Sequence, residues 1–100
     1  MIDVQDVYED LCRLLDTDET LLERMAQALP VTHEETRIVC FELVRFLVWK
    51  SLYPNKLIAP TEEVDEVWHE FILHTELYRE FCKTHFGTFI DHRPLSDSRV

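Results

Sequence analysis

The chain has a single glycine, Gly87, among its 100 residues. Glycine is the residue that tight β-hairpin turns use most, because it adopts a positive φ angle without steric cost. With one glycine and four prolines, this chain has few ways to connect neighbouring strands by tight turns. The shortage favours helices joined by short loops, and it therefore predicts an all-α fold.

Apolar residues recur at three- and four-residue steps along most of the chain, as they do in amphipathic helices. This spacing predicts four helices, over residues 3–15, 21–29, 33–53 and 62–85. The third is apolar on nearly all sides, so we expect it to be central and wrapped by the others. We therefore predict one domain over residues 1–100, a compact bundle of four to five helices around a central apolar helix.

Polar residues and the glycine stand at the predicted helix ends. Thr32 and Glu35 have the T-x-x-E spacing of a capping box, and Thr61 stands where it can cap the fourth helix. Gly87 follows that helix, and a glycine in the left-handed conformation is a common C-terminal stop. These residues support the boundaries that the apolar spacing predicts.

The formal net charge is −10, from 20 acidic and 10 basic residues. Ten of the acids lie in residues 1–35, together with only two basic residues, Arg13 and Arg24. Such a surface repels phosphate groups, so we expect neither direct nucleic-acid binding nor binding to a membrane. It would suit a protein partner with a basic surface. The alternative is that the acids serve solubility alone.

The three cysteines, Cys12, Cys40 and Cys82, are far apart and form no C-x-x-C pair. This arrangement predicts neither a zinc ribbon nor a disulfide framework, and it fits the reduced thiols of a cytoplasmic protein. The N-terminal residues lack the basic and apolar regions of an export signal. The most apolar run, residues 38–49, is too short for a membrane span and contains Glu42 and Arg45. We therefore expect a cytoplasmic location.

Candidate metal ligands occur in the fourth predicted helix and after it. Asp65 and His69 are four residues apart, so they share one face of a helix, and His92 is a third candidate. Two histidines and a carboxylate suit a divalent metal such as zinc or iron. The structural alternative is that Asp65 accepts a hydrogen bond from His69 and that the pair fixes the helix against the C-terminal tail.

Two other arrangements in this region are excluded. His69 and His74 are five residues apart, whereas the H-E-x-x-H motif of zinc proteases needs its histidines four apart on one face. Cys82 and His85 could form a nucleophile pair, but Cys82 lies with Trp68 and Tyr78 on the apolar face of the predicted helix, where cysteine behaves as a small buried hydrophobe. We therefore expect no catalytic residues.

A straight fourth helix would prevent the three ligands from meeting. His69 and a helix end near His85 are about 24 Å apart at 1.5 Å per residue. The five residues from Gly87 to His92 span at most about 17 Å. A shared site therefore requires the helix to break, and we expect the break around residues 75–80. The alternative is that the helix is straight and His92 joins a different site near Cys82 and Tyr78.

The segment 57–94 carries an unusual combination of motifs: D-x-x-W-H, then Y-x-x-F-C, F-G and I-x-H-x-P. In this combination it resembles the glycine-rich domain-containing-protein-like family. The matching residues are Pro60, Thr61, Val64, Asp65, Trp68, His69, Ile72, Leu73, Tyr78, Phe81, Cys82, Phe86, Gly87, Ile90, His92 and Pro94. The resemblance implies that Asp65, His69 and His92 belong to one shared site.

The chain departs from the longer members of that family in two respects. They tend to read W-H-T-H-M-L-H-P, so Phe71 stands in place of a second histidine and Thr75 in place of a proline. The glycine-rich tail is also absent. The resemblance therefore implies a helical module and a set of motif residues, but no reaction.

From these features we expect a small acidic, non-catalytic interaction or regulatory module. It would bind one divalent metal, zinc or iron, through Asp65, His69 and His92, and its partner would be a protein with a basic surface. One alternative is a metal-dependent enzyme that uses the same three residues. Another is an acidic inhibitor, or nucleic-acid mimic, that blocks a basic protein surface.

Overall fold

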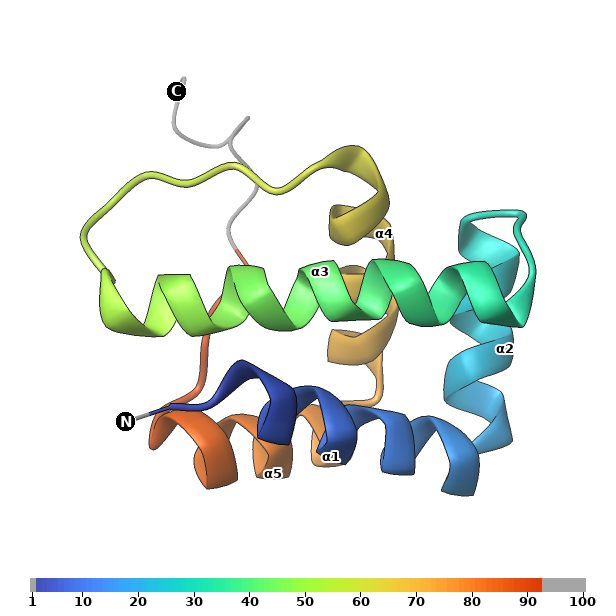
Figure 1. Ribbon diagram of the computed structural model, residues 1–100, viewed down its shortest axis with the longest axis horizontal. Coiled ribbons are helices and arrows are strands. Elements are labelled where there is room, and N and C mark those ends of the chain that lie inside the picture. Colours follow the sequence, from blue (N-terminus) through green and yellow to red (C-terminus); the bar gives the residue numbers. More distant parts are fainter. Residues whose placement is uncertain (1, 93–100) are drawn as a thin grey trace.

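The computed structural model describes residues 2–92, which form five α-helices and no β-strand (Figure 1). The prediction of an all-α bundle is confirmed. In chain order the helices are α1 (Val4–Thr17), α2 (Glu19–Ala28), α3 (His33–Leu52), α4 (Glu62–Leu73) and α5 (Thr75–Phe86). None of these helices is long and apolar enough to cross a membrane.

The predicted caps occur at the helix ends. Thr32 accepts a hydrogen bond from the Glu35 backbone N–H at 3.0 Å, and the Glu35 carboxylate accepts one from the Thr32 backbone N–H at 3.2 Å, which completes the capping box. The Thr61 hydroxyl accepts the Val64 N–H at 3.2 Å at the start of α4. Gly87 follows α5 with a φ angle of 71°, the left-handed conformation that ends this helix.

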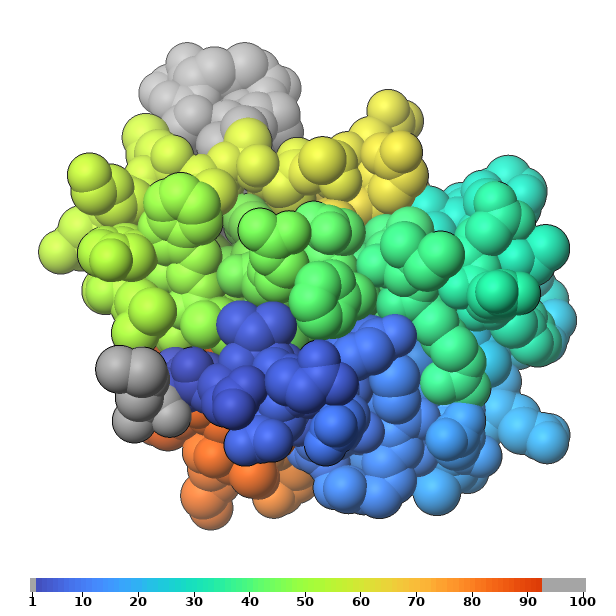
Figure 2. Space-filling view, in the orientation of Figure 1, coloured from blue at the N-terminus to red at the C-terminus, as the bar shows by residue number. Residues whose placement is uncertain are grey.

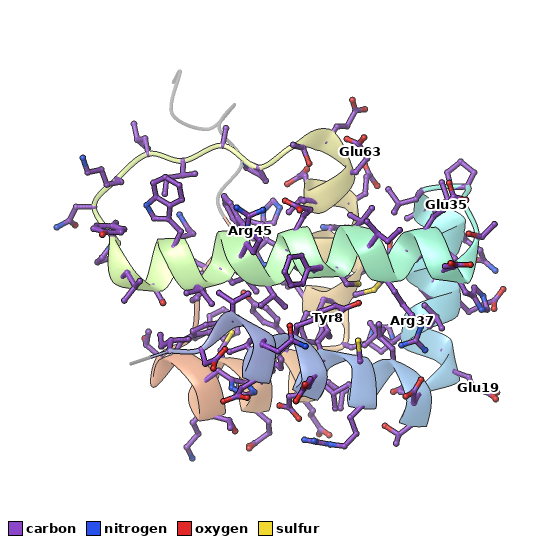
Figure 3. All side chains as sticks on the ribbon, in the orientation of Figure 1. Tyr8, Glu19, Glu35, Arg37, Arg45 and Glu63 are labelled. Atoms are coloured by element: carbon purple, nitrogen blue, oxygen red, sulfur yellow. The ribbon has the colours of Figure 1, made fainter. Side chains whose placement is uncertain are left out.

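Helix α3 packs against α1, α2 and α4. One of these contacts involves Tyr8 of α1, whose hydroxyl donates a hydrogen bond to the Arg37 carbonyl oxygen of α3 at 3.2 Å (Figure 3). The buried side chains of α3 lie along a single stripe of the helix: Thr36, Cys40, Leu43, Val44, Leu47 and Val48.

Apolar residues on the outer side of α3 are exposed. Ile38 and Leu52, at 62% and 57% exposed, belong to the pattern that had predicted a helix wrapped on all sides. The other helices cover the buried stripe of α3 and leave this side open. Burial of α3 is therefore one-sided, although its sequence is apolar nearly all round.

The predicted helix over residues 62–85 is two helices. α4 ends at Leu73, α5 begins at Thr75, and His74 between them has a φ angle of −88° and a ψ angle of 69°. The apolar spacing had predicted one helix here, whereas the distance argument for the three ligands predicted a break around residues 75–80. The break is present, one residue earlier, at His74. Because the chain turns there, α5 packs back against α4, and the residues that follow α5 return towards α4.

Candidate functional site

Two of the three predicted ligands, Asp65 and His92, are in contact, and the third, His69, lies nearby on α4. Asp65 and His69 lie on successive turns of this helix, and His92 lies in the segment that follows α5. His92 Nε2 is 2.6 Å from Asp65 Oδ1, although the two residues are 27 positions apart. The ring centroids of His69 and His92 are 6.4 Å apart. The break at His74 therefore brings His92 to Asp65, which a straight helix would have prevented.

The histidine that is hydrogen-bonded to Asp65 is His92, and not His69 as the structural alternative from the sequence had proposed. The sequence paired Asp65 with His69, four residues later on the same helix. In the structure the carboxylate is bonded to His92, while the His69 side chain is exposed. The contact joins the C-terminal segment to α4, so Asp65 does hold the tail, but through His92.

A second set of contacts beside this pair is centred on the buried side chain of Tyr78. The Trp68 indole N–H donates a hydrogen bond to the Tyr78 hydroxyl at 2.9 Å, and that hydroxyl donates to the Ile90 carbonyl oxygen at 2.6 Å. The ring of His92 packs on Trp68 with centroids 4.3 Å apart, and Phe89 packs edge-on against Tyr78 at 5.2 Å. One hydroxyl group thus links α4, α5 and the segment after α5.

We call Asp65, Trp68, Tyr78, Ile90 and His92 the tail clamp. Burial raises the pKa of Tyr78 well above its ordinary value, so the phenol stays protonated and remains a donor to Ile90. Each buried hydrogen bond of this kind contributes about 1 kcal/mol to stability. The clamp gives five residues of the 57–94 motif a structural role.

Sequence reasoning missed the hydrogen bonds of Trp68 and Tyr78, which it had placed on the apolar face of a single helix. A signal for them was present. Both side chains carry a polar atom on a face that was expected to be buried, and a buried indole N–H or phenol O–H usually has a hydrogen-bond partner. The spacing could not identify that partner, because the carbonyl group of Ile90 reaches Tyr78 only after the chain has turned back.

His85 and Cys82 of α5 do not form a nucleophile pair. His85 Nε2 lies 2.5 Å from Asp10 Oδ2 of α1, 75 residues away in the chain. Burial lowers the pKa of His85, as does the charge of Arg13, while Asp6 acts in the opposite direction. The neutral ring therefore donates its Nε2–H to Asp10. Cys82 is fully buried, and burial raises the pKa of its thiol, so it is not an activated nucleophile.

The side chains of residues 2–92, as they stand, form no group of three histidine, cysteine or acidic residues that could hold a metal ion. The third candidate, His69, is exposed, and its ring centroid is 6.4 Å from that of His92. The contact between Asp65 and His92 is also too short for a metal that both would bind. Two ligand atoms of a tetrahedral zinc ion lie about 3.3 Å apart, because each bond is about 2.0 Å long. At 2.6 Å the two atoms share a proton and leave no room for a metal between them. Binding would require these side chains to separate and His69 to turn towards them.

The fold and the clamp define a small all-α protein in which residues 88–92 are held against α4 and α5. The model of the UCP032817-like family matches residues 9–97, and the chain belongs to this family. No curated protein and no solved structure matched the chain. The resemblance to the glycine-rich domain-containing-protein-like family stays a prediction.

Proposed function

We propose that the chain is a small acidic, non-catalytic module that binds another protein. The observation that carries this proposal is a group of large apolar side chains exposed at the end of α3 and just after it. We call this group the Trp49 surface. Its members and their exposed fractions are Trp49 at 54%, Leu52 at 57%, Tyr53 at 51% and Leu57 at 89%.

The geometry of the Trp49 surface favours binding. Trp49, Leu52 and Tyr53 have the i, i+3, i+4 spacing that places side chains on one face of a helix. The rings of Trp49 and Tyr53 are in edge-on contact, with centroids 6.1 Å apart. A turn, closed by a hydrogen bond from the Lys56 N–H to the Tyr53 carbonyl at 3.1 Å, leads to Leu57. The apolar side chains are thus close together along the chain, and the two rings contact each other.

The residue types also support an interaction surface. Exposed contiguous apolar groups often mark sites of protein association. Tryptophan and tyrosine are enriched among the residues that contribute most to binding free energy. A lone exposed Ile38 needs no such explanation, because single surface hydrophobes are common.

The acidic surface supplies a second recognition element in this proposal. Among the ten acids of residues 1–35, only Asp10 and Asp18 are partly buried, and the others are exposed. Glu19 is an example that extends away from the bundle in Figure 3. Such a surface accelerates association with a basic partner. An inhibitor that blocks a basic protein surface would be one form of the same module.

The test compares the proteins captured by the wild-type chain and by a Trp49→Ser, Leu57→Ser double variant. We expect a partner that the wild type retains and the double variant loses. Ile38→Ser is the matched control, because it removes an equally exposed apolar side chain elsewhere on α3. Capture that is unchanged in the double variant, or equally reduced in the control, would contradict the proposal.

The second candidate function is binding of one divalent metal, zinc or iron, by Asp65, His69 and His92. The contact between Asp65 and His92 favours it, because it brings two potential ligands together from distant parts of the chain. A metal would replace the proton that the pair shares. The metal-dependent enzyme is the form of this candidate in which a ligand position stays open to substrate.

Calorimetric titration with Zn²⁺ tests the metal candidate. We expect one ion per chain, with binding lost in Asp65→Asn and weakened in His69→Gln. His74→Gln is the control, because the His74 ring bonds the Glu70 carbonyl oxygen of its own helix at 3.0 Å. Absence of binding, or binding that all three variants retain, would rule out the three-residue site.

A further inference from the structure

We infer that the Trp49 surface receives an acidic amphipathic peptide segment of a protein partner. This inference rests on the proposed function and names the chemistry of the occupant. It depends on a local reversal of charge. Although the chain carries −10 overall, residues 43–61 contain three cations, Arg45, Lys50 and Lys56, and no acid.

These cations are neighbours of the apolar members of the Trp49 surface along the chain. Lys50 follows Trp49, and Lys56 precedes Leu57. Arg45 is one helical turn before Trp49, on the same face of α3. Its guanidinium contacts the Glu42 carboxylate at 3.5 Å, so its charge is partly offset.

The local balance is nevertheless positive. The C-terminal end of α3 contributes about half a negative charge through the helix dipole. Lys50 and Lys56 together outweigh this partial charge. Charges further than about 8–10 Å are largely screened at physiological ionic strength. The electrostatic energy of a bound peptide therefore depends mainly on these neighbouring charges.

The three acidic residues labelled in Figure 3 lie away from this end of α3. In Figure 3 Glu63 lies at the start of α4, at the opposite end of the connector from the end of α3, and Glu19 and Glu35 are further still. Figure 2 shows the end of α3 and the first part of the connector, in yellow-green, at the outer edge of the molecule. A peptide could therefore place apolar side chains on Trp49 and Leu57 and its carboxylates near the two lysines.

Nuclear magnetic resonance of the ¹⁵N-labelled chain tests this inference, because the chain has two tryptophans in opposite environments. The indole N–H of Trp68 is buried and bonded to Tyr78, whereas Trp49 is exposed. The Trp49 signal therefore reports occupancy, and the Trp68 signal reports that the fold is intact. The probes are two helical peptides with identical apolar faces, one with glutamates and one with lysines on the polar face.

We expect the glutamate peptide to shift the Trp49 signal and to leave the Trp68 signal in place. In a Lys50→Glu, Lys56→Glu double variant its affinity should fall about tenfold or more, because like charges then face each other. Phosphatidylserine vesicles, as a second anionic probe, should leave the Trp49 signal unchanged.

The outcomes separate the inference from the proposed function. If the lysine peptide shifts the Trp49 signal as strongly as the glutamate peptide, the acidic occupant is wrong, while the interaction surface stands. If neither peptide shifts it, or if only the vesicles do, the peptide inference is overturned. The proposed function is judged independently, by whether the Trp49→Ser, Leu57→Ser variant loses its captured partner.

Discussion

At the scale of single residues, the Tyr78 hydroxyl has the most consequential position in the motif. It accepts the indole N–H of Trp68 and donates to the carbonyl oxygen of Ile90, and all three groups are buried. A buried hydroxyl that both donates and accepts a hydrogen bond stabilises the fold, and its removal leaves two buried partners without hydrogen bonds. The same atom therefore decides whether the segment after α5 stays against α4.

Tyr78→Phe should lower the free energy of unfolding by about 2–3 kcal/mol, because the Trp68 N–H and the Ile90 carbonyl both lose their partner. Urea denaturation monitored by circular dichroism measures this change. Tyr53→Phe is the matched control: the same atom is removed from an exposed ring, and the expected change is below about 0.5 kcal/mol. Equal effects of the two substitutions would show that the clamp contributes no stability.

The lowered pKa of His85 predicts how stability changes with pH. The unfolded chain, with a histidine pKa of about 6.5, binds a proton that the folded chain takes up only at lower pH. Stability from this group is therefore present above about pH 6.5 and is lost as the pH falls towards the folded pKa. The charged groups that act on the ring are Asp10, Arg13 and Asp6.

His85→Gln should reduce this loss, so that the free energy of unfolding falls less between pH 7 and pH 5.5 than in the wild type. Denaturation curves at the two pH values provide the measurement. His33→Gln, at an exposed contact with Glu23, serves as the control and should retain the wild-type difference. A wild-type chain that becomes more stable at pH 5.5, with the gain lost in His85→Gln, would mean that Asp10 raises the pKa instead.

At the scale of elements, the corner at His74 determines which side chains of α4 and α5 are buried. Phe71 is fully buried and contacts the rings of Tyr78 and Phe81, with centroids 5.1 and 5.2 Å away. Leu73, only two residues later, is 60% exposed at the end of α4. At this corner an aromatic cluster joins the two helices, while Leu73 at the turn itself is exposed to solvent.

Phe71→Ala should destabilise the chain by about 3–5 kcal/mol, because it removes a core ring and leaves a cavity between α4 and α5. Leu73→Ala is the control and should change the free energy of unfolding by less than about 0.5 kcal/mol. Thermal and urea denaturation measure both. A large effect at Leu73 would contradict the corner, since that residue would then be packed.

At the scale of the whole molecule, the net charge of −10 acts against the compact state. Like charges on a folded surface repel one another, and salt screens this repulsion. Most acids of α1 and α2 are exposed, so the screening should be effective there.

The melting temperature should therefore rise between 10 mM and 300 mM NaCl, as measured by circular dichroism. An Asp6→Asn, Glu9→Gln double variant removes two exposed acids of α1 and should show a smaller rise. Glu42→Gln, which removes an acid beside Arg45, is the control and should retain the wild-type rise. A melting temperature that is independent of salt would show that the acids are too widely spaced to destabilise the fold.

The sequence by itself determined those features that depend on residues within about one helical turn. The capping box of Thr32 and Glu35, the stop at Gly87 and the helical periodicity all involve partners three or four residues apart, whose geometry any helix reproduces. The shared face of Asp65 and His69 is a feature of the same kind. These local rules were sufficient for the all-α class.

Only the tertiary structure decided which distant groups meet. The break at His74 involves neither glycine nor proline, so no local signal marked that residue. Because the position of the break was not known, the sequence could not predict that His92 contacts Asp65 or that Tyr78 contacts Ile90. The contact of His85 with Asp10 joins residues 75 positions apart, which no local pattern predicts. The exposure of Trp49 was decided in the same way. An apolar residue on a helix is buried only where another element covers it, and the path of the whole chain determines where those elements lie.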